Sequence, residues 1–174
     1  MSRVAVVGVT GAGKTTMAET LAQRLGVMHV ELDSLHWDPG WQQAPREVFR
    51  RRVAEALSGP SWVADGNYSK TRDLVWGRAD TLVWLDYSRR LAFGRLITRT
   101  FRRIMRREQL WNGNRETLRG TLLSRDSLLL YLFQSHGRLR RSYPQALQDP
   151  RYAHLKVVRL RSPREADRWL TGLD

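Results

Sequence analysis

The sequence predicts an α/β fold in which helices cover both faces of a parallel β-sheet. Two observations support this prediction. Short apolar runs alternate with segments of helical periodicity along the chain, an order typical of parallel sheets with helical crossovers. A glycine-rich turn with the pattern G-x-x-x-x-G-K-T, residues 8–15, joins the first apolar run to the first helical segment.

The elements are expected in the following order. The first strand covers residues 4–7, and the first helix covers 14–25 and ends at Gly26. Later strands are predicted at 27–32, 61–64, 81–85 and 156–160, and helices at 45–57, about 70–77, 88–107 and 126–141. Residues 38–40 form a turn, 111–120 a mobile polar loop, and the capping-box pattern at 162–165 begins a last helix.

Length and composition limit the classes of protein. A chain of 174 residues is long enough for one domain, and we expect residues 1–174 to form it. The sequence has no cysteine, which excludes disulfides and thiolate metal sites. No apolar run approaches the roughly 20 residues of a membrane helix, so we expect a cytoplasmic protein without a membrane partner.

The net charge of +13 predicts an anionic ligand such as a nucleotide or nucleic acid. Eight arginines and no acid lie in one predicted helix, and a smaller cluster lies in a later one at Arg138, Arg140 and Arg141. A solvated helix face is the alternative interpretation of any single arginine. The eight are Arg89, Arg90, Arg95, Arg99, Arg102, Arg103, Arg106 and Arg107.

The glycine-rich turn has the residue types that a phosphate-binding loop (P-loop) needs. Glycines let successive N–H groups converge on an anion, and the following helix adds its positive end. Lys14 would reach the β- and γ-phosphates, and the Thr15 hydroxyl would ligate Mg²⁺. We therefore expect ATP or GTP at a site formed by Gly8, Thr10, Gly11, Ala12, Gly13, Lys14, Thr15 and Thr16.

A magnesium site of this kind usually includes an acid at the end of a neighbouring strand. The sequence offers two candidates, Asp65 after the strand at 61–64 and Asp86 after the strand at 81–85. Spacing alone does not choose between them, and one of the two can equally be a strand-end cap.

Four further segments resemble the adenylate-kinase-like branch of P-loop kinases, and within it the DNA topology modulation proteins. They are LDSLHW at 32–37, WVADGNYSKTR at 62–72, RADTLVWLD at 78–86 and WNGNRE at 111–116. The resemblance implies a P-loop three-layer sandwich of about five parallel strands. It also implies acceptor-site helices at about 34–60 and an arginine-rich lid at about 104–122 that closes over ATP.

The resemblance also implies roles for individual residues. Asp65, in the Asp-Gly pair, would hold Mg²⁺ and is preferred to Asp86. Arg95 and Arg99 lie nine and thirteen residues after Asp86 and would face the nucleotide. Arg115 and Arg119 would add lid arginines. Planar guanidinium groups suit the charge of a transferring phosphoryl group.

The chain departs from adenylate kinases where they bind the phosphate of the acceptor. His36 replaces one of their arginines, and Ser69 replaces another, with Arg72 further on. The Asp-x-Leu-His sequence at 33–36 instead resembles small-molecule kinases of the gluconate kinase type. This favours a hydroxyl acceptor with Asp33 as general base. A helix N-cap or pocket-shaping acid is the alternative role of Asp33.

Residues that follow Asp33 and Asp65 in the sequence are expected to form the acceptor pocket. We place His36, Trp37, Gly66, Asn67, Tyr68 and Arg72 there, and Trp41 beside Trp37. Packing beneath the acceptor-site helices is the alternative role of the tryptophans. The remaining histidines, His29, His136 and His154, lack metal-type spacing and are expected to be structural or surface residues.

The sequence therefore predicts a P-loop kinase that transfers the γ-phosphoryl group of ATP·Mg²⁺ to a small molecule. Two alternatives stay open: a nucleoside monophosphate kinase, and a nucleotide-switched nucleic-acid-binding protein. The second is not favoured, because no nucleic-acid-binding motif is present and a lid over a triphosphate accounts for much of the arginine density. The sequence does not identify the acceptor, the preferred purine or the oligomeric state.

Overall fold

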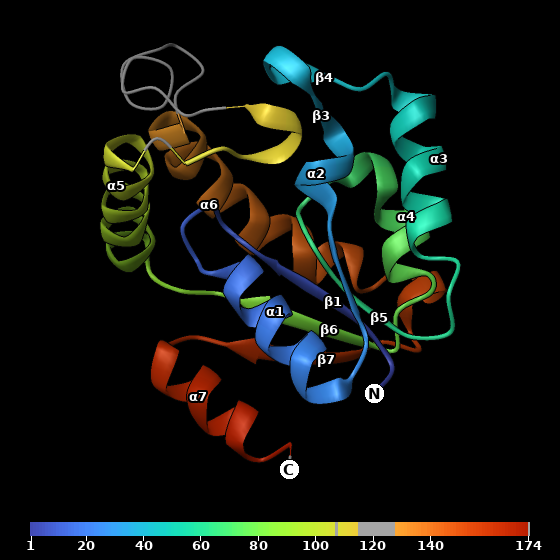
Figure 1. The fold of residues 1–174 in the computed structure, drawn as a ribbon. Helices are drawn as coiled ribbons and strands as arrows, with labels where there is room; N and C mark the ends of the chain where they lie inside the picture. Colours follow the sequence, from blue (N-terminus) through green and yellow to red (C-terminus); the bar gives the residue numbers. More distant parts are fainter. Residues whose placement is uncertain (107, 115–127, 174) are drawn as a thin grey trace.

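The computed structural model describes residues 1–106, 108–114 and 128–173, without the side chains of 128–131. Five parallel strands form the main sheet in the order β2-β5-β1-β6-β7. They are β1 (Arg3–Gly8), β2 (Met28–Glu31), β5 (Trp62–Asp65), β6 (Thr81–Leu85) and β7 (Lys156–Leu160). The expected parallel α/β architecture is confirmed (Figure 1).

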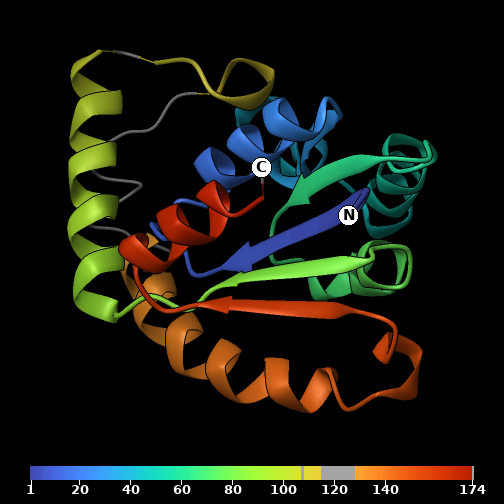
Figure 2. The ribbon, with the colours of Figure 1, turned by 90° about the horizontal axis from the view of Figure 1, so that it is seen from below.

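Helices cover both faces of this sheet. In two views at right angles, α1 (Lys14–Leu25) and α7 (Pro163–Thr171) lie on one face, and α6 (Leu128–Ala146) lies on the other (Figures 1 and 2). The remaining α-helices are α2 (Leu32–His36), α3 (Arg46–Ala56), α4 (Arg72–Trp76) and α5 (Arg89–Met105). Short 3-10 turns are η1 (Pro39–Trp41), η2 (Ser69–Thr71), η3 (Trp111–Gly113) and η5 (Pro150–Tyr152).

The core lies between the central strands and these helices. Every residue of β5 and β6 is buried, as expected for parallel strands covered on both faces. On the α6 side, Tyr143 packs edge-on against both Trp76 and Trp84, with ring centroids 5.4 Å apart in each pair. Because α4, β6 and α6 each contribute one ring, this cluster fixes α4 against the sheet.

Some element boundaries differ from those expected. The strand predicted at 27–32 ends at Glu31, because Leu32 begins the short helix α2 and buries its side chain. Asp65 is the last residue of β5 rather than the residue after a strand. A two-stranded hairpin of β3 (Trp37–Asp38) and β4 (Gln42–Gln43) flanks the predicted turn and was not expected.

Part of the predicted lid lies outside the described residues. Of the loop expected at 111–120, the structure describes 111–114, where 111–113 form η3. The helix expected at 126–141 corresponds to α6, which is described from Leu128 and continues to Ala146 with Pro144 inside it. Within the described ranges, no helix combines the length and apolarity needed to cross a membrane.

Candidate active site

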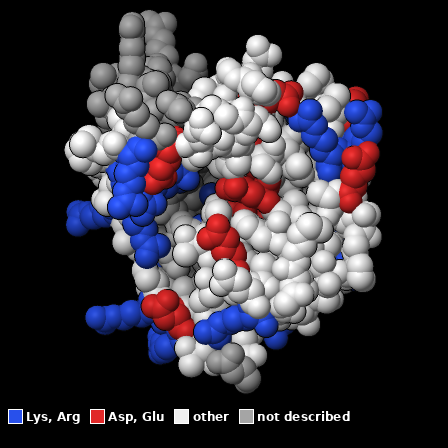
Figure 3. Space-filling view, in the orientation of Figure 1, with Lys and Arg blue, Asp and Glu red and all other residues white. Residues whose placement is uncertain are grey.

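The carboxyl ends of three neighbouring strands place the predicted residues together. In the parallel register, Asp65 of β5 lies beside Val6 of β1 and Glu31 of β2. The loop after β1, residues 8–15, therefore begins beside the strand ends that carry Asp65 and Glu31. In the space-filling view, basic side chains gather over α5 and acidic side chains lie across a hollow from them (Figure 3).

Glycine is required in this loop for two reasons. Gly11 and Gly13 have φ angles of 77° and 90°, which residues with a Cβ rarely adopt. A Cβ on Gly11 would also lie 2.3 Å from the carbonyl oxygen of Ala92 in α5. The loop therefore curls closely against α5, and a curled glycine loop before a helix is the kind of structure that can bind an anion.

Lys14 is the first residue of α1, and its Nζ donates to the Val9 carbonyl oxygen at 3.3 Å across the loop. Burial lowers the pKa of Lys14, while the charges of Asp33 and Asp65 act in the opposite direction. The lysine thus lies near both acids that the sequence assigned to the chemistry, one from α2 and one from β5.

A cluster of oxygen ligands surrounds Thr15. Its hydroxyl donates to Asp65 Oδ2 at 3.0 Å and lies 3.3 Å from Glu31 Oε1. Hydroxyl and carboxylate oxygens are the ligands that Mg²⁺ prefers, so the donor set fits this ion. No group of three or more acids, histidines or cysteines in the described ranges could hold a metal alone, so an ion here would take its remaining ligands from water or a bound anion.

Glu31 was not identified from the sequence. Burial raises its pKa, and a 2.6 Å hydrogen bond from Trp111 Nε1 to its Oε2 opposes that shift. The available signal was its place at the carboxyl end of a parallel strand, one strand away from Asp65. The predicted strand end at residue 32 obscured it.

His29 also has a role that the sequence did not suggest. Its Nε2 lies 2.7 Å from Asp65 Oδ1, and this hydrogen bond raises the pKa of His29. Asp65 is buried and uses one oxygen for His29 and the other for Thr15. The orientation of the carboxylate is therefore fixed from both sides.

Asp33 lies in the first turn of α2 and not in an open turn after a strand. The Tyr68 hydroxyl donates to Asp33 Oδ1 at 2.5 Å, which fixes the carboxylate and leaves Oδ2 for another partner. Helix α2 has no side-chain cap, so Asp33 does not serve as its N-cap.

The residues after Asp65 differ in what they contact. Asn67 Oδ1 accepts from the Gly8 amide at 3.1 Å and from the Tyr143 hydroxyl at 2.9 Å, and its Nδ2 donates to the Gly8 carbonyl. Asn67 thus braces the phosphate-binding loop. A narrow cleft next to it is lined by Leu32, Gly66, Asn67, Tyr68, Arg72 and Trp76, among others.

His36 and Trp37 lie outside that cleft. His36 is 5% exposed, and its ring packs on Phe49 and Tyr68 with centroids 4.8 and 4.5 Å away. Burial lowers its pKa, so the neutral ring is favoured. Trp37 is half-buried and packs edge-on against Trp41. These contacts favour the packing interpretation of both rings over direct contact with an acceptor.

The segment that includes η3 packs against α2 and the hairpin of β3 and β4, which the sequence did not predict. The Asn114 side chain accepts from the Trp41 amide at 2.9 Å and donates to the Asp38 carbonyl at 3.0 Å. Together with the hydrogen bond from Trp111 to Glu31, these contacts join this part of the predicted lid to the end of β2 and to the hairpin.

The two arginines predicted on α5 lie beside the loop. Arg95 Nη1 donates to the Ala12 carbonyl oxygen at 3.2 Å, and its guanidinium lies 5.5 Å from the Tyr87 ring centroid. Arg99 is one turn further along α5, and its charge contributes to the lowered pKa of Lys14.

Four further predicted site residues come from the predicted lid, the loop and α1. Arg115 and Arg119 lie outside the described residues. Thr10 is half-buried in the loop and Thr16 is exposed on α1.

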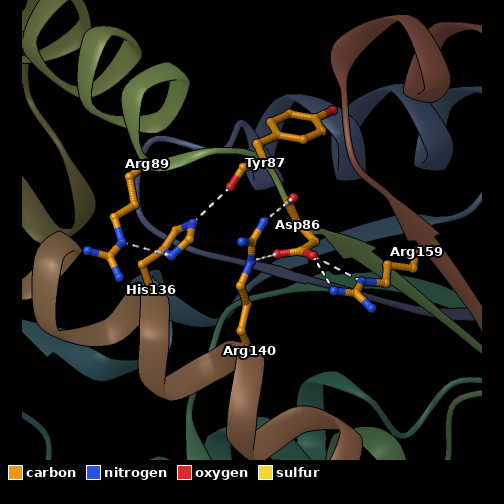
Figure 4. Close-up of polar contacts among 6 residues, drawn as sticks. All are labelled: Asp86, Tyr87, Arg89, His136, Arg140 and Arg159. Atoms are coloured by element: carbon orange, nitrogen blue, oxygen red, sulfur yellow. Dashed lines mark hydrogen bonds and ion pairs between the residues drawn. The ribbon is translucent and has the colours of Figure 1, made fainter.

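Asp86, the other candidate metal ligand, is held by arginines. Arg140 Nε donates to Asp86 Oδ1 at 2.6 Å, and Arg159 donates twice to Oδ2, at 3.0 and 2.6 Å (Figure 4). Asp86 is buried, so both of its oxygens are used inside the protein. This arrangement favours a structural role for Asp86 and leaves Asp65 as the candidate metal ligand.

The adjoining histidine in Figure 4 is structural, as expected. His136 is buried; its Nε2 lies 3.0 Å from the Tyr87 carbonyl oxygen and its Nδ1 accepts from Arg89 Nε at 3.2 Å. A carbonyl accepts and an arginine N–H donates, so the ring is neutral with its proton on Nε2. The cluster ties α6 to the turn that begins α5.

Comparisons with known proteins identify the fold. Solved structures that cover nearly the whole chain include a shikimate kinase from Bacteroides thetaiotaomicron (17% identity, 99% of this chain and 96% of that one, TM-score 0.56). A gluconokinase from Sinorhizobium meliloti 1021 (20%, 99% and 93%, 0.54) and a sugar kinase from Janibacter sp. HTCC2649 (24%, 100% and 95%, 0.52) are also similar. The shared fold is that of adenylate-kinase-like P-loop kinases.

No protein-family model and no curated protein matches the sequence. The broader resemblance to P-loop kinases is therefore supported at the level of fold. The narrower resemblance to DNA topology modulation proteins stays a prediction.

Proposed function

We propose that this protein is a P-loop kinase that transfers the γ-phosphoryl group of ATP to a hydroxyl of a small-molecule acceptor. One observation carries the proposal: the loop brings Thr15 against Asp65 of β5, and the charges of Asp65 and of Asp33 in α2 both act on the neighbouring Lys14. Asp65 contacts the hydroxyl of Thr15, while Asp33 contacts a phenol on the acceptor side. A triphosphate held at Lys14 would thus have a metal-binding acid on one side and a free carboxylate oxygen on the other.

The phosphate-binding loop would hold the triphosphate through its backbone N–H groups and Lys14. Thr15 and Asp65, with Glu31 beside them, would hold Mg²⁺, which neutralises charge on the β- and γ-phosphates when bound. Arg95 and Arg99 would face the transferring group, with Arg115 and Arg119 as further candidates from the lid. His29 would keep Asp65 in the orientation that the site needs.

Asp33 would act as the general base. As the acceptor oxygen bonds to the γ-phosphorus and the bond to the β-bridging oxygen breaks, the hydroxyl proton moves to Asp33 Oδ2 and ADP leaves. The hydrogen bond from Tyr68 occupies Oδ1 and so directs the other oxygen to the acceptor. Closure of the lid would exclude water and favour transfer over hydrolysis.

The names of the similar structures support the acceptor class. A shikimate kinase, a gluconokinase and a sugar kinase are each named for a substrate that carries hydroxyl groups. Use of ATP and Mg²⁺ also agrees with the cytoplasmic location that we infer from the sequence.

The experiment is a steady-state assay of ADP release with ATP, Mg²⁺ and a panel of polyols, hydroxy acids, sugars, nucleosides and nucleoside monophosphates. We expect turnover with a hydroxyl acceptor, and we expect Asp33→Asn to lower kcat by about 10²- to 10⁴-fold. Asp149→Asn, at a half-buried acid paired with Arg151, is the matched control and should keep full activity. Full turnover by Asp33→Asn would refute the base role, and exclusive use of monophosphates would favour the alternative kinase class.

A further inference from the structure

Arg72 is a half-buried cation that faces the narrow cleft on the acceptor side. It is the first residue of α4, and its guanidinium carbon lies 4.8 Å from the ring centroid of Trp76 and 5.8 Å from that of Tyr143. Among the described residues, no hydrogen bond or ion pair to the Arg72 guanidinium is present. Two aromatic rings therefore orient the guanidinium, while its N–H groups have no acceptor within the described protein.

Nearby arginines differ from Arg72 in this respect. Arg50 donates to Asp73, the residue next to Arg72, at 2.7 Å, and Arg52 donates to Asp38 at 2.8 Å. The acid adjacent in sequence to Arg72 thus pairs with another arginine. A partly desolvated cation without an acid partner is costly, and a bound anion would remove that cost.

The lining of the cleft suggests a small anionic group. Leu32, Val75 and Trp76 provide apolar walls, and Arg72 is the charged residue among the described residues that line it. A guanidinium presents a planar fork that matches the two oxygens of a carboxylate or phosphate.

The cleft is also connected to the proposed base. Tyr68 lines it and donates through its hydroxyl to Asp33 Oδ1. We propose that Arg72 binds an anionic group of the phosphoryl acceptor, so that the acceptor is a small hydroxylated carboxylate or phosphate monoester. This inference rests on the proposed function: the anion lies at Arg72, and the reacting hydroxyl lies past Tyr68 at Asp33.

The first test compares acceptors that differ in charge alone. Turnover is measured for neutral polyols, for the corresponding aldonic acids and for the corresponding sugar monophosphates, which separates the two sources of an anionic group. We expect kcat/KM for one anionic series to exceed that of the neutral polyols by at least about tenfold. Arg72→Gln should lower it by about 10- to 100-fold, mainly through KM, and Arg72→Lys should restore part of the loss.

The matched control is Arg151→Gln, because Arg151 is exposed and pairs with Asp149 away from the cleft. It should leave kcat/KM unchanged for every series. Equal use of neutral and anionic acceptors, or an equal loss for all series in Arg72→Gln, would overturn the inference while leaving a kinase in place.

A binding measurement separates this inference from the proposed function. The melting temperature is recorded with Mg²⁺ and a non-hydrolysable ATP analogue, before and after adding each acceptor series. We expect a further rise with an anionic series in the wild type and no such rise in Arg72→Gln. Stabilisation by the analogue without a charge-selective rise would overturn the Arg72 inference. Absence of stabilisation by the analogue itself would count against the proposed function.

Discussion

The phosphate side and the acceptor side of the candidate site are built in different ways. The phosphate side, residues 8–15, depends on backbone conformation. Three glycines of this loop have positive φ angles, and Gly11 packs directly against α5. The acceptor side depends on side chains from distant segments, such as the hydrogen bond from Tyr68 to Asp33 and the stacking of Arg72 on Tyr143. Backbone recognition suits a phosphate chain common to all nucleotides, while side-chain recognition can vary with the acceptor.

The two acids at the ends of β5 and β6 provide the largest expected effects. Asp65→Asn should raise the Mg²⁺ concentration required for half-maximal turnover by about 10- to 100-fold with little change in fold, because it removes a ligand charge. Asp86→Asn should instead lower the free energy of unfolding by about 1–2 kcal/mol, because Arg140 and Arg159, both partly exposed, lose the charge of their buried acid.

Magnesium titrations and urea unfolding of both variants check this contrast. If Asp86→Asn altered the Mg²⁺ requirement while Asp65→Asn did not, the two acids would have to exchange roles. Because the two substitutions are chemically identical, each variant is the control for the other.

Substitutions of two glycines, Gly11 and Gly94, test how far the phosphate side depends on its backbone conformation. Gly11→Ala should lower the free energy of unfolding by about 1–3 kcal/mol and weaken nucleotide binding, because the new methyl group would meet the Ala92 carbonyl and the φ angle is positive. Gly94→Ala on α5 is the matched control. A Cβ there meets no atom within 4 Å, so it should stabilise the helix by about 0.5–1 kcal/mol.

Thermal unfolding and binding of an ATP analogue measure both effects. Equal stability and nucleotide affinity of Gly11→Ala and the wild type would show that the loop does not depend on close packing against α5.

The sequence predicted the strand, loop and helix around residues 8–15 well, because their signal is local. Eight consecutive residues specify the loop, and strand and helix patterns on either side place it in the sheet. The acceptor side was predicted less completely, because its contacts join residues far apart in sequence, such as Tyr68 with Asp33 and Arg72 with Tyr143. His36 was assigned to the pocket from its position after Asp33, yet packing on Phe49 turns its ring into the core.

The smallest expected effect is a pH dependence of stability at Asp80, which directly precedes β6 at the amino-terminal ends of the strands. Burial tends to raise the pKa of Asp80, but hydrogen bonds from the amides of Arg3 and Ser2 and from the hydroxyls of Thr81 and Ser2 outweigh it and lower the pKa to about 2. The ionised acid therefore stabilises the fold above about pH 4, and this contribution is lost as the pH falls toward 2.

Melting temperatures of the wild type and Asp80→Asn between pH 2 and pH 7 test this effect. The wild type should be the more stable at pH 7, the difference should shrink toward pH 2, and turnover at pH 7 should be unchanged. A difference in melting temperature that stayed constant with pH would show that the charge of Asp80 has no part in it.

The most direct test of the central claim is calorimetric titration of the protein with a non-hydrolysable ATP analogue, with and without Mg²⁺. The backbone conformation of residues 8–15 and the position of Lys14 predict saturable binding of one analogue per chain, tighter with Mg²⁺ and lost in Lys14→Ala. Absence of saturable binding to the wild type under both conditions would contradict the account.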